Sequence, residues 1–287
     1  MLPTRLHRDG RWHFQHGPID LVIGAEGPAA AAAHEAAWQR FQAVLSELVA
    51  ELPLLREPVR AGACPLRGVV ARRMWQACAP FRDVFITPMA AVAGAVAQEI
   101  IVAYQRDGIT RAWVNNGGDI ALFLAPGRSA RVGLFADLAR FHPAQQGDLP
   151  LDGRFEVHAD MPVRGVATSG WRGRSFSLGI ADSVTVLAET AAMADAAATV
   201  IANAANVQDP RIVRRPARTL KDDSDLGDIE VTVDVPPLPP AAVSAALRSG
   251  ALRALQLRDC GLIHAAVLFC QGQVQAVEAV EVGSVLA

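Results

Sequence analysis

The chain has 287 residues, a length that fits one large domain or two small ones. Hydrophobic residues make up 51% and charged residues 20%, so a sizeable core is available and a disordered chain is excluded. The formal net charge is −2, which disfavours a partner held by bulk positive charge, such as nucleic acid. Of the 27 basic residues 26 are arginines, so chemistry that requires a lysine has one candidate, Lys221.

No segment of the sequence predicts a membrane protein. Residues 1–18 are polar and lack the apolar centre of a signal peptide. The longest apolar stretch, residues 89–97, has nine residues, whereas a membrane-spanning helix needs about 20. We therefore expect a cytoplasmic protein without a membrane or nucleic-acid partner, and a homodimer stays open.

The N-terminal half predicts a hairpin, three helices and two further strands. The hairpin surrounds His16-Gly17-Pro18, and Asn116-Gly117-Gly118-Asp119 predicts a tight turn. Pro28 and Pro88 each suit the first position of a helix, the second with Thr87 as N-cap. The predicted elements are strands 12–15 and 19–23, helices 28–52, 69–79 and 88–106, and strands 111–115 and 120–124.

The C-terminal half predicts short strands around two helices. A basic run, residues 211–218, and an acidic run, residues 222–228, are interpreted as one solvated surface loop. The predicted elements are strands 132–135, 155–159, 164–167, 175–178 and 183–187, helix 189–205, strand 231–235, helix 241–248, and strands 264–269 and 274–277.

Helices and antiparallel strands alternate in this list without a regular βαβ rhythm, which predicts an α+β fold with mixed or antiparallel sheets and packed helices. We expect a single domain over residues 1–287. Its motif-bearing core spans about residues 89–205, and a C-terminal α/β extension, about residues 207–287, packs on that core.

The first segment that can carry chemistry is VNNGGDI, residues 114–120. Consecutive glycines, Gly117 and Gly118, permit positive φ and the close approach of a ligand to the backbone amides. Asp119 can accept hydrogen bonds from a ribose or a ring N–H. An ordinary hairpin turn explains the same residues.

The second segment is ATSG followed by WRGR, residues 167–174. Hydroxyls and arginines suit a phosphate ester, because arginine donates two parallel hydrogen bonds, and an indole can stack on a flat ring. The candidate ligand-binding residues are Thr168, Ser169, Gly170, Trp171, Arg172 and Arg174. A turn with solvent-facing arginines is the alternative.

The third segment is ADAAAT, residues 194–199, in a predicted helix. Asp195 and Thr199 are four residues apart, so their oxygens project from one helical face. Such hard oxygen ligands suit Mg²⁺ or Ca²⁺, provided that a substrate phosphate completes the coordination. A surface Asp, with the Thr bonded to the preceding turn, is the structural alternative.

Taken in this order, a helix with Gly94-Ala95-Val96-Ala97 and then VNNGGDI, ATSG, SVTVLA and ADAAAT, the chain resembles the ApbE-like superfamily over about residues 89–205. Its best-known members are FAD:protein FMN transferases, Mg²⁺-dependent α+β enzymes that cleave FAD and attach FMN to a Ser or Thr of a flavoprotein. The C-terminal part resembles an uncharacterised branch of that superfamily.

The resemblance implies flavin contacts and Mg²⁺ ligands on matching residues. The implied flavin contacts are Gly117, Gly118, Asp119, Thr168, Ser169 and Gly170. The implied Mg²⁺ ligands are Asp195, Thr199 and the carbonyls of Ala95 and Ala198. Two positions depart from the transferases, since Val92 replaces an Asp and Gln98 a Lys, and their His-Ile-Ile-Asp-Pro stretch is absent.

Three functions remain open from the sequence. One is an enzyme that uses Mg²⁺ to transfer flavin or to cleave the FAD pyrophosphate, with a flavoprotein as target. Another is a non-catalytic flavin- or nucleotide-binding accessory protein for flavoenzyme maturation, because no proton acceptor is evident. The last is an enzyme for an unrelated small molecule in the same cleft.

Overall fold

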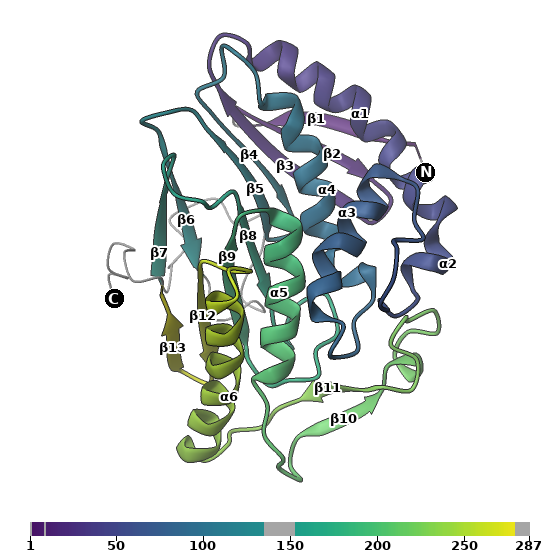
Figure 1. The fold of residues 1–287 in the computed structure, drawn as a ribbon, viewed down its shortest axis with the longest axis vertical. Coiled ribbons are helices and arrows are strands. Elements are labelled where there is room, and N and C mark those ends of the chain that lie inside the picture. Colours follow the sequence, from purple (N-terminus) through teal and green to yellow (C-terminus); the bar gives the residue numbers. More distant parts are fainter. Residues whose placement is uncertain (1, 9, 135–152, 279–287) are drawn as a thin grey trace. The chain divides into compact units, whose positions relative to one another are not determined.

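The computed structural model describes residues 2–8, 10–134 and 153–278 (Figure 1). The chain forms two compact units, and each collects three separate stretches of sequence. The first unit comprises Met1–Ala130, Val157–Ala167 and Ala188–Ala196. The second comprises Arg131–Glu156, Thr168–Leu187 and Ala197–Ala287. The prediction of one domain with a packed C-terminal extension stays a prediction.

The first unit contains an antiparallel sheet whose strands pair in the order β1-β2-β3-β4-β5-β8. The alternating burial of β4 shows that one face of this strand points into a core. The strands are β1 (Thr4–Arg8), β2 (Arg11–His16), β3 (Ile19–Glu26), β4 (Arg111–Asn116), β5 (Asp119–Leu124) and the start of β8 (Gly165–Ser169).

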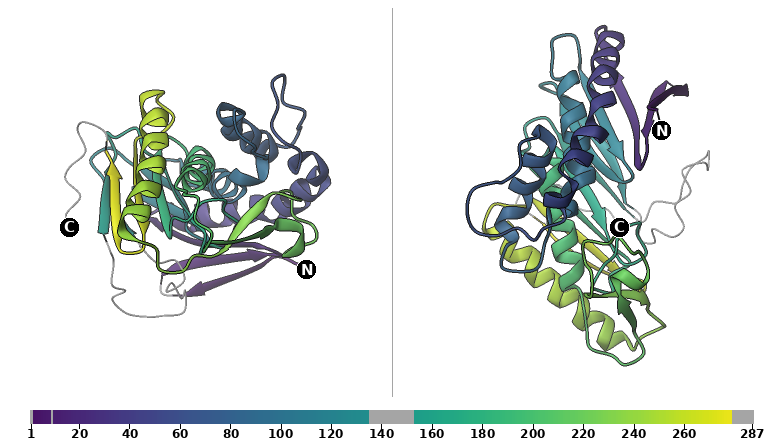
Figure 2. Two further views of the ribbon diagram at one scale, coloured as in Figure 1. Left: turned by 90° about the horizontal axis from the view of Figure 1, so that it is seen from below. Right: turned by 90° about the vertical axis from the view of Figure 1, so that its right-hand side faces the viewer.

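Helices of the first unit pack on this sheet, with α4 against β4 and β5 and α1 against β2 and β3 (Figures 1 and 2). Phe14, Phe41 and Tyr104 are among the fully buried side chains that fill the core. The helices are α1 (Ala30–Ala50), α2 (Leu52–Leu55), α3 (Val69–Cys78) and α4 (Val92–Ile101), with 3₁₀ turns η1 (Ala79–Phe81), η2 (Pro88–Ala91) and η3 (Val102–Tyr104) and the first residues of α5 (Ala191–Ala204).

In the second unit, three antiparallel strands pair in the order β9-β12-β13, and α6 packs on β12 and β13. Two further strand pairs, β6-β7 and β10-β11, complete the unit. The elements are β6 (Ser129–Leu134), β7 (Gly153–His158), β9 (Ser183–Ala188), β10 (Val213–Pro216), the 3₁₀ turn η5 (Ala217–Thr219), β11 (Glu230–Asp234), α6 (Pro240–Asp259), β12 (Ala265–Cys270) and β13 (Gln273–Val277).

These elements confirm the α+β class and most of the predicted helices and strands. The strand predicted at 132–135 is β6, and its residue 135 lies outside the described residues. None of the helices that the structure describes has both the length and the apolar character needed to cross a membrane.

Two predictions about local structure are wrong. Residues 175–178 form no strand, because the N–H of Leu178 donates to the side-chain oxygen of Asn203, 2.9 Å away, instead of to a neighbouring strand. Pro28 is not the first helical residue, since the N–H of Ala29 bonds the carbonyl of Gly108 and α1 begins at Ala30.

Two further elements differ from their predicted extent. The helix predicted from Pro88 starts as a 3₁₀ turn, and Thr87 makes no side-chain cap to it. The last helix continues beyond residue 248 to Asp259, because Gly250 lets it pack closely on Ala205 and Leu268. Part of the basic run, predicted as loop, forms strand β10.

A close contact between α4 and the start of α5 determines where the candidate site forms. A Cβ atom added to Gly94 would collide with the carbonyl of Ala191 and would lie 2.9 Å from the Cβ of Asp195. The missing side chain of Gly94 therefore lets the two helices approach until their backbones touch.

Gly94→Ala is expected to lower the free energy of unfolding by about 1–3 kcal/mol, because the added methyl group forces the helices apart. Urea unfolding measures this change. Gly68→Ala is the control, since the one close contact of its added Cβ would be the end of the flexible Glu51 side chain, 2.8 Å away, with Ala71 at an ordinary 3.6 Å. Equal midpoints for Gly94→Ala and the wild type would contradict the described packing.

Candidate functional site

The carboxylate of Asp195 lies against the first turn of α4. Its Oδ2 atom accepts the N–H of Gly94 at 2.9 Å, and the N–H of Ala93 also donates to it. Helix α4 starts after Ala91, which has no side chain that can cap it. Asp195 therefore satisfies N–H groups that the first turn of a helix leaves without an intrahelical partner.

The surroundings of Asp195 disfavour the ionised form of its carboxyl group. Burial raises the pKa of Asp195 well above its ordinary value, and the nearby charge of Asp119 raises it further. The two backbone hydrogen bonds act in the opposite direction without cancelling this rise. Since Asp195 is a half-buried residue, a bound cation could stabilise the carboxylate.

The β4–β5 hairpin places Asp119 beside this carboxylate. Gly117 and Gly118, the two central turn residues, have φ of +67° and +118°, as in the tight turns that suit hairpins. The side chain of Asn115 accepts the N–H of Gly118 at 2.8 Å. The amide of the buried Asn116 donates to the carbonyl of Ala93 at 3.1 Å and ties the turn to the start of α4.

Gln98 occupies the position where the resemblance expects a lysine. Its side-chain oxygen accepts the N–H of Ala192 at 3.2 Å, at the start of α5. The Gln98 amide on α4 thus binds the first turn of α5. It brings no positive charge to Asp195, which also lies on α5. Gln98 therefore does not provide the positive charge that the resemblance expects at this position.

The remaining predicted metal ligands lie on α4 and on the later part of α5. Ala95 and Ala198 are fully buried within these helices, where a backbone carbonyl normally bonds the N–H four residues ahead. Thr199 is half-buried and four residues after Asp195 on α5, as predicted. Their role as ligands stays a prediction.

The residues of the first unit fit a weakly held hard cation. In the described part of the chain, no three His, Cys, Asp or Glu side chains come close enough to hold a metal alone. Asp195 and Asp119 supply two carboxylates, the oxygen donors that Mg²⁺ prefers. Mg²⁺ usually retains waters and binds one or two carboxylates plus substrate phosphates, so this donor set matches its chemistry.

The second unit holds the predicted phosphate-binding loop, which follows β8. The guanidinium of Arg172 lies over the ring of Trp171, with 5.0 Å from Cζ to the ring centroid. Both side chains also interact with the carboxylate of Asp182. Arg174 is exposed on the same loop. The loop thus presents cations beside a flat ring, and their contact with a ligand stays a prediction.

The TSG residues have different surroundings. Thr168 shares a 2.9 Å hydrogen bond with the hydroxyl of Thr185 on β9, and Ser169 is half-buried. Gly170 is buried, and a Cβ there would collide with the carbonyl of Asp182. Close packing alone thus explains Gly170, while its contact with a ligand stays a prediction.

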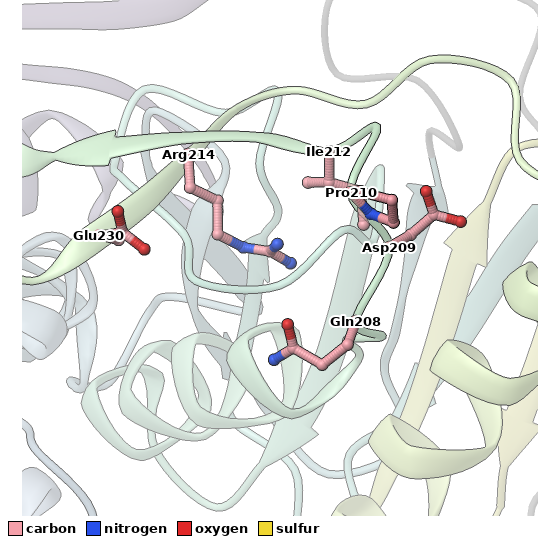
Figure 3. A pocket seen from close by; sticks show the side chains of 6 residues that line it. All are labelled: Gln208, Asp209, Pro210, Ile212, Arg214 and Glu230. Carbon is pink, nitrogen blue, oxygen red and sulfur yellow. The ribbon is translucent and has the colours of Figure 1, made fainter.

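A surface hollow of about 490 Å³ lies elsewhere in the second unit (Figure 3). Arg214 projects into it and donates to the side chain of Asn206 at 2.7 Å. Arg211 binds Asp209 beside the hollow and lowers the pKa of that carboxyl to about 2. The lining residues are Gln208, Asp209, Pro210, Ile212, Arg214 and Glu230. None of these was predicted as a ligand-binding residue.

The structure thus groups the predicted residues into two clusters. The first unit brings Asp119 and Asp195 together at the start of α4, and the second unit gathers Trp171 and Arg172 on one loop. The sequence reasoning missed Asp182 and the bond of Asn116 to α4. Asn116 belongs to the quoted VNNGGDI segment, but Asp182 carried no motif signal beyond its place before SVTVLA.

Comparison with known proteins identifies relatives along almost the whole chain. The model of the family described as "AbpE bacteria" matches residues 4–276. The UPF0280 protein MK0206 of Methanopyrus kandleri is 35% identical over 253 residues, which cover 83% of this chain and 94% of that protein. A UPF0280 protein of Methanosarcina acetivorans is 33% identical over 193 residues, 67% of this chain and 71% of that protein.

Two solved structures align with most of the chain at low identity. One is the flavinyl transferase ApbE of Pseudomonas stutzeri in its apo form, with 12% identity, a TM-score of 0.45, and coverage of 98% of this chain and 96% of that chain. The other is the apbe protein of Thermotoga maritima, with 14% identity, a TM-score of 0.46 and 96% coverage of both chains.

Asp195→Asn is expected to stabilise the protein at pH 8 in the presence of EDTA. Because the folded state raises the pKa of Asp195, its protonated form favours folding below the ordinary value of 3.8. That advantage is lost as the pH rises through the raised value, whereas the amide of the variant would keep a neutral acceptor at every pH. Urea unfolding at pH 5 and pH 8 measures the difference.

Asp195→Ala serves as the paired variant, since it removes the acceptor as well as the charge. Its free energy of unfolding should fall by about 1 kcal/mol, as when a helix loses its cap. The account fails if Asp195→Asn destabilises the protein equally at both pH values, because the carboxylate charge would then stabilise the fold.

Proposed function

The chain belongs to the AbpE bacteria family, and on this premise we propose that it binds a flavin nucleotide, FAD or FMN, together with Mg²⁺. The ApbE-like motifs point to this ligand class, and the match to the family model extends the relation from these motifs to residues 4–276. The UPF0280 relatives carry no activity in their names, so the proposal depends on the residues of the two clusters.

The observation that carries the proposal is the place of the Asp195 carboxylate, which accepts the N–H of Gly94 at the start of α4 and is close enough to Asp119 to feel its charge. Two neighbouring carboxylates in a partly buried place repel each other, and a divalent cation would remove this repulsion. We assign Asp195 and Asp119 as the residues that hold Mg²⁺. Thr199 and the carbonyls of Ala95 and Ala198 are the further ligands that the resemblance implies.

Flavin contacts are proposed for both sequence segments. The turn at Gly117 and Gly118 offers backbone that a ligand can approach, since nothing lies within 4 Å of a Cβ built on Gly118. On the second segment, Trp171 and Arg172 suit the flat ring and the phosphate of a nucleotide. Thr168, Ser169, Gly170 and Arg174 complete the proposed set.

With FAD as ligand, the reaction that fits these residues is breakage of the pyrophosphate bond. Attack by water gives FMN and AMP, whereas attack by the hydroxyl of a target protein forms a phosphoester with FMN and releases AMP and the hydroxyl proton. Bound Mg²⁺ would supply charge neutralisation at the phosphates. Asp195 and Asp119 would hold this ion. An arginine of the second segment would stabilise the departing phosphate.

A second candidate is a non-catalytic flavin-binding protein that assists the maturation of a flavoenzyme. The bond of Gln98 to the N–H of Ala192 favours it, because the cation of the transferases is replaced by a side chain with a structural contact. The absent His-Ile-Ile-Asp-Pro stretch removes a proton acceptor as well. This candidate keeps the ligand and the metal but not the cleavage.

Binding and turnover are tested with FAD and Mg²⁺ on the purified protein. Flavin fluorescence follows binding, and chromatography follows the release of FMN or AMP. We expect Mg²⁺ to tighten binding about tenfold or more, and Asp195→Asn to abolish this effect because one of two carboxylates is lost. Asp107→Asn, on an exposed loop, is the matched control.

Each result has a separate meaning. Release of AMP that Asp195→Asn abolishes supports the enzyme, whereas Mg²⁺-dependent binding without release supports the accessory protein. If neither FAD nor FMN binds with or without Mg²⁺, the proposed function is wrong and the site serves another ligand.

A further inference from the structure

Asp182 lies directly before β9, and its carboxylate binds hydrogen-bond donors from two separate segments of the second unit. Its Oδ1 atom accepts the indole N–H of Trp171 at 3.2 Å and lies 3.4 Å from Nε of Arg172. Its Oδ2 atom accepts the backbone N–H of Gln271 at 2.6 Å. Only 11% of the Asp182 side chain is exposed, so these contacts replace water around the charge.

The contacts of Asp182 fix two side chains of an otherwise accessible loop. Arg172 keeps 34% of its side chain exposed, and its guanidinium lies over the Trp171 ring. A stacked cation or an ion pair at such a place is weak by itself. Because Oδ1 binds the edge of the indole and also attracts the guanidinium, one buried carboxylate orients both groups together.

The turn behind Asp182 is built to present a backbone donor to it. Gln271, between β12 and β13, has φ of +44°, the one positive φ at a residue other than glycine in the described chain. Its side chain accepts the N–H of Leu238 at 2.9 Å and donates to the carbonyl of Pro236 at 2.8 Å. Such a backbone conformation persists where surrounding contacts enforce it.

The β-strand framework also holds Asp182 from its own backbone. Its N–H donates to the carbonyl of Phe269 at 2.9 Å, and its carbonyl lies where any side chain at Gly170 would collide. The backbone of Asp182 is therefore fixed, and its carboxylate lies between Gln271 and the WRGR loop. If Asp182 served only to accept the N–H of Gln271, Trp171 and Arg172 would have no need to bind its other carboxylate oxygen together.

We propose that Asp182 is a positioning residue, which holds Trp171 and Arg172 as a preformed platform for the flat ring and phosphate of a nucleotide. This inference rests on the proposed function, because it specifies how one segment of that site recognises its ligand. Orienting both side chains before binding avoids the entropy cost of ordering them on the ligand. Asp182 itself touches no ligand.

A double-mutant cycle tests this role in the full-length protein, with FMN and AMP as probes and calorimetry as the measurement. Asp182→Asn keeps the size of the side chain but loses its charge, and Arg172→Gln removes the guanidinium. We expect each single variant to weaken FMN binding about tenfold, and the double variant to bind nearly as well as either single variant. Arg248→Gln, on the exposed side of α6, should bind like the wild type.

Trp171→Phe provides a second test that leaves Asp182 in place. It keeps an aromatic ring but removes the N–H that Asp182 binds and makes the ring smaller, so we expect weaker FMN binding, and Asp182→Asn in the Trp171→Phe background should weaken it little further. This variant decides the question if Asp182→Asn fails to fold. The indole ¹H–¹⁵N resonance of Trp171 should also shift in Asp182→Asn. If Asp182 had only a structural role, the double-mutant cycle would show no coupling between Asp182 and Arg172 in FMN binding.

The outcomes separate this inference from the proposed function. If the wild type binds FMN but the losses in the cycle multiply to about a hundredfold, or Trp171→Phe binds normally, the positioning role is wrong and flavin binding stands. If AMP binds, FMN does not, and the cycle is non-additive, the positioning role stands and the flavin proposal fails. If neither probe binds, both are wrong.

Discussion

The candidate site depends on one unfavourable arrangement, a partly buried carboxylate beside a second carboxylate. Asp195 accepts the N–H groups of Ala93 and Gly94, which gives it a structural role at the start of α4. Burial and the charge of Asp119 nevertheless keep its pKa raised, so hydrogen bonding to the helix does not offset the cost of its charge. A site with this imbalance is suited to a cation that arrives with a ligand.

The backbone around Asp195 explains how the fold maintains that arrangement. Gly94 allows α4 and α5 to touch, and the hairpin turn brings Asp119 to the same place. The amide of Asn116 joins the turn to the carbonyl of Ala93. The close approach at Gly94 and the side-chain bond of Asn116 thus fix the three elements to one another, which leaves the carboxylates little freedom to move apart.

Local patterns allowed most of the fold and part of the site to be predicted. The turn at Gly117 and Gly118 follows from consecutive glycines between alternating strands, and the face shared by Asp195 and Thr199 follows from helical spacing. The sequence indicated only that Gln98 lacks the charge of a lysine, whereas the structure gives its side chain a hydrogen-bond partner, the N–H of Ala192. The single lysine, Lys221, pairs with Asp223 at 3.8 Å.

Features that depend on distant partners could not be predicted from local patterns. Residues 175–178 alternate like a strand, but Asn203 of α5 takes the N–H of Leu178. Residues 213–216 of the basic run form strand β10 only because β11 lies beside them. Asp182 meets Trp171 across eleven residues of chain, and it meets Gln271 across 89, so its role required the tertiary structure.

A crystal structure of the protein grown with Mn²⁺ and FMN tests the central claim most directly, since Mn²⁺ takes similar ligands to Mg²⁺ and gives an anomalous signal. The account predicts an anomalous peak within about 2–2.6 Å of a carboxylate oxygen of Asp195, with a phosphate oxygen of FMN on the same ion. Bound FMN with no ion at Asp195, or an ion bound only elsewhere, would contradict it.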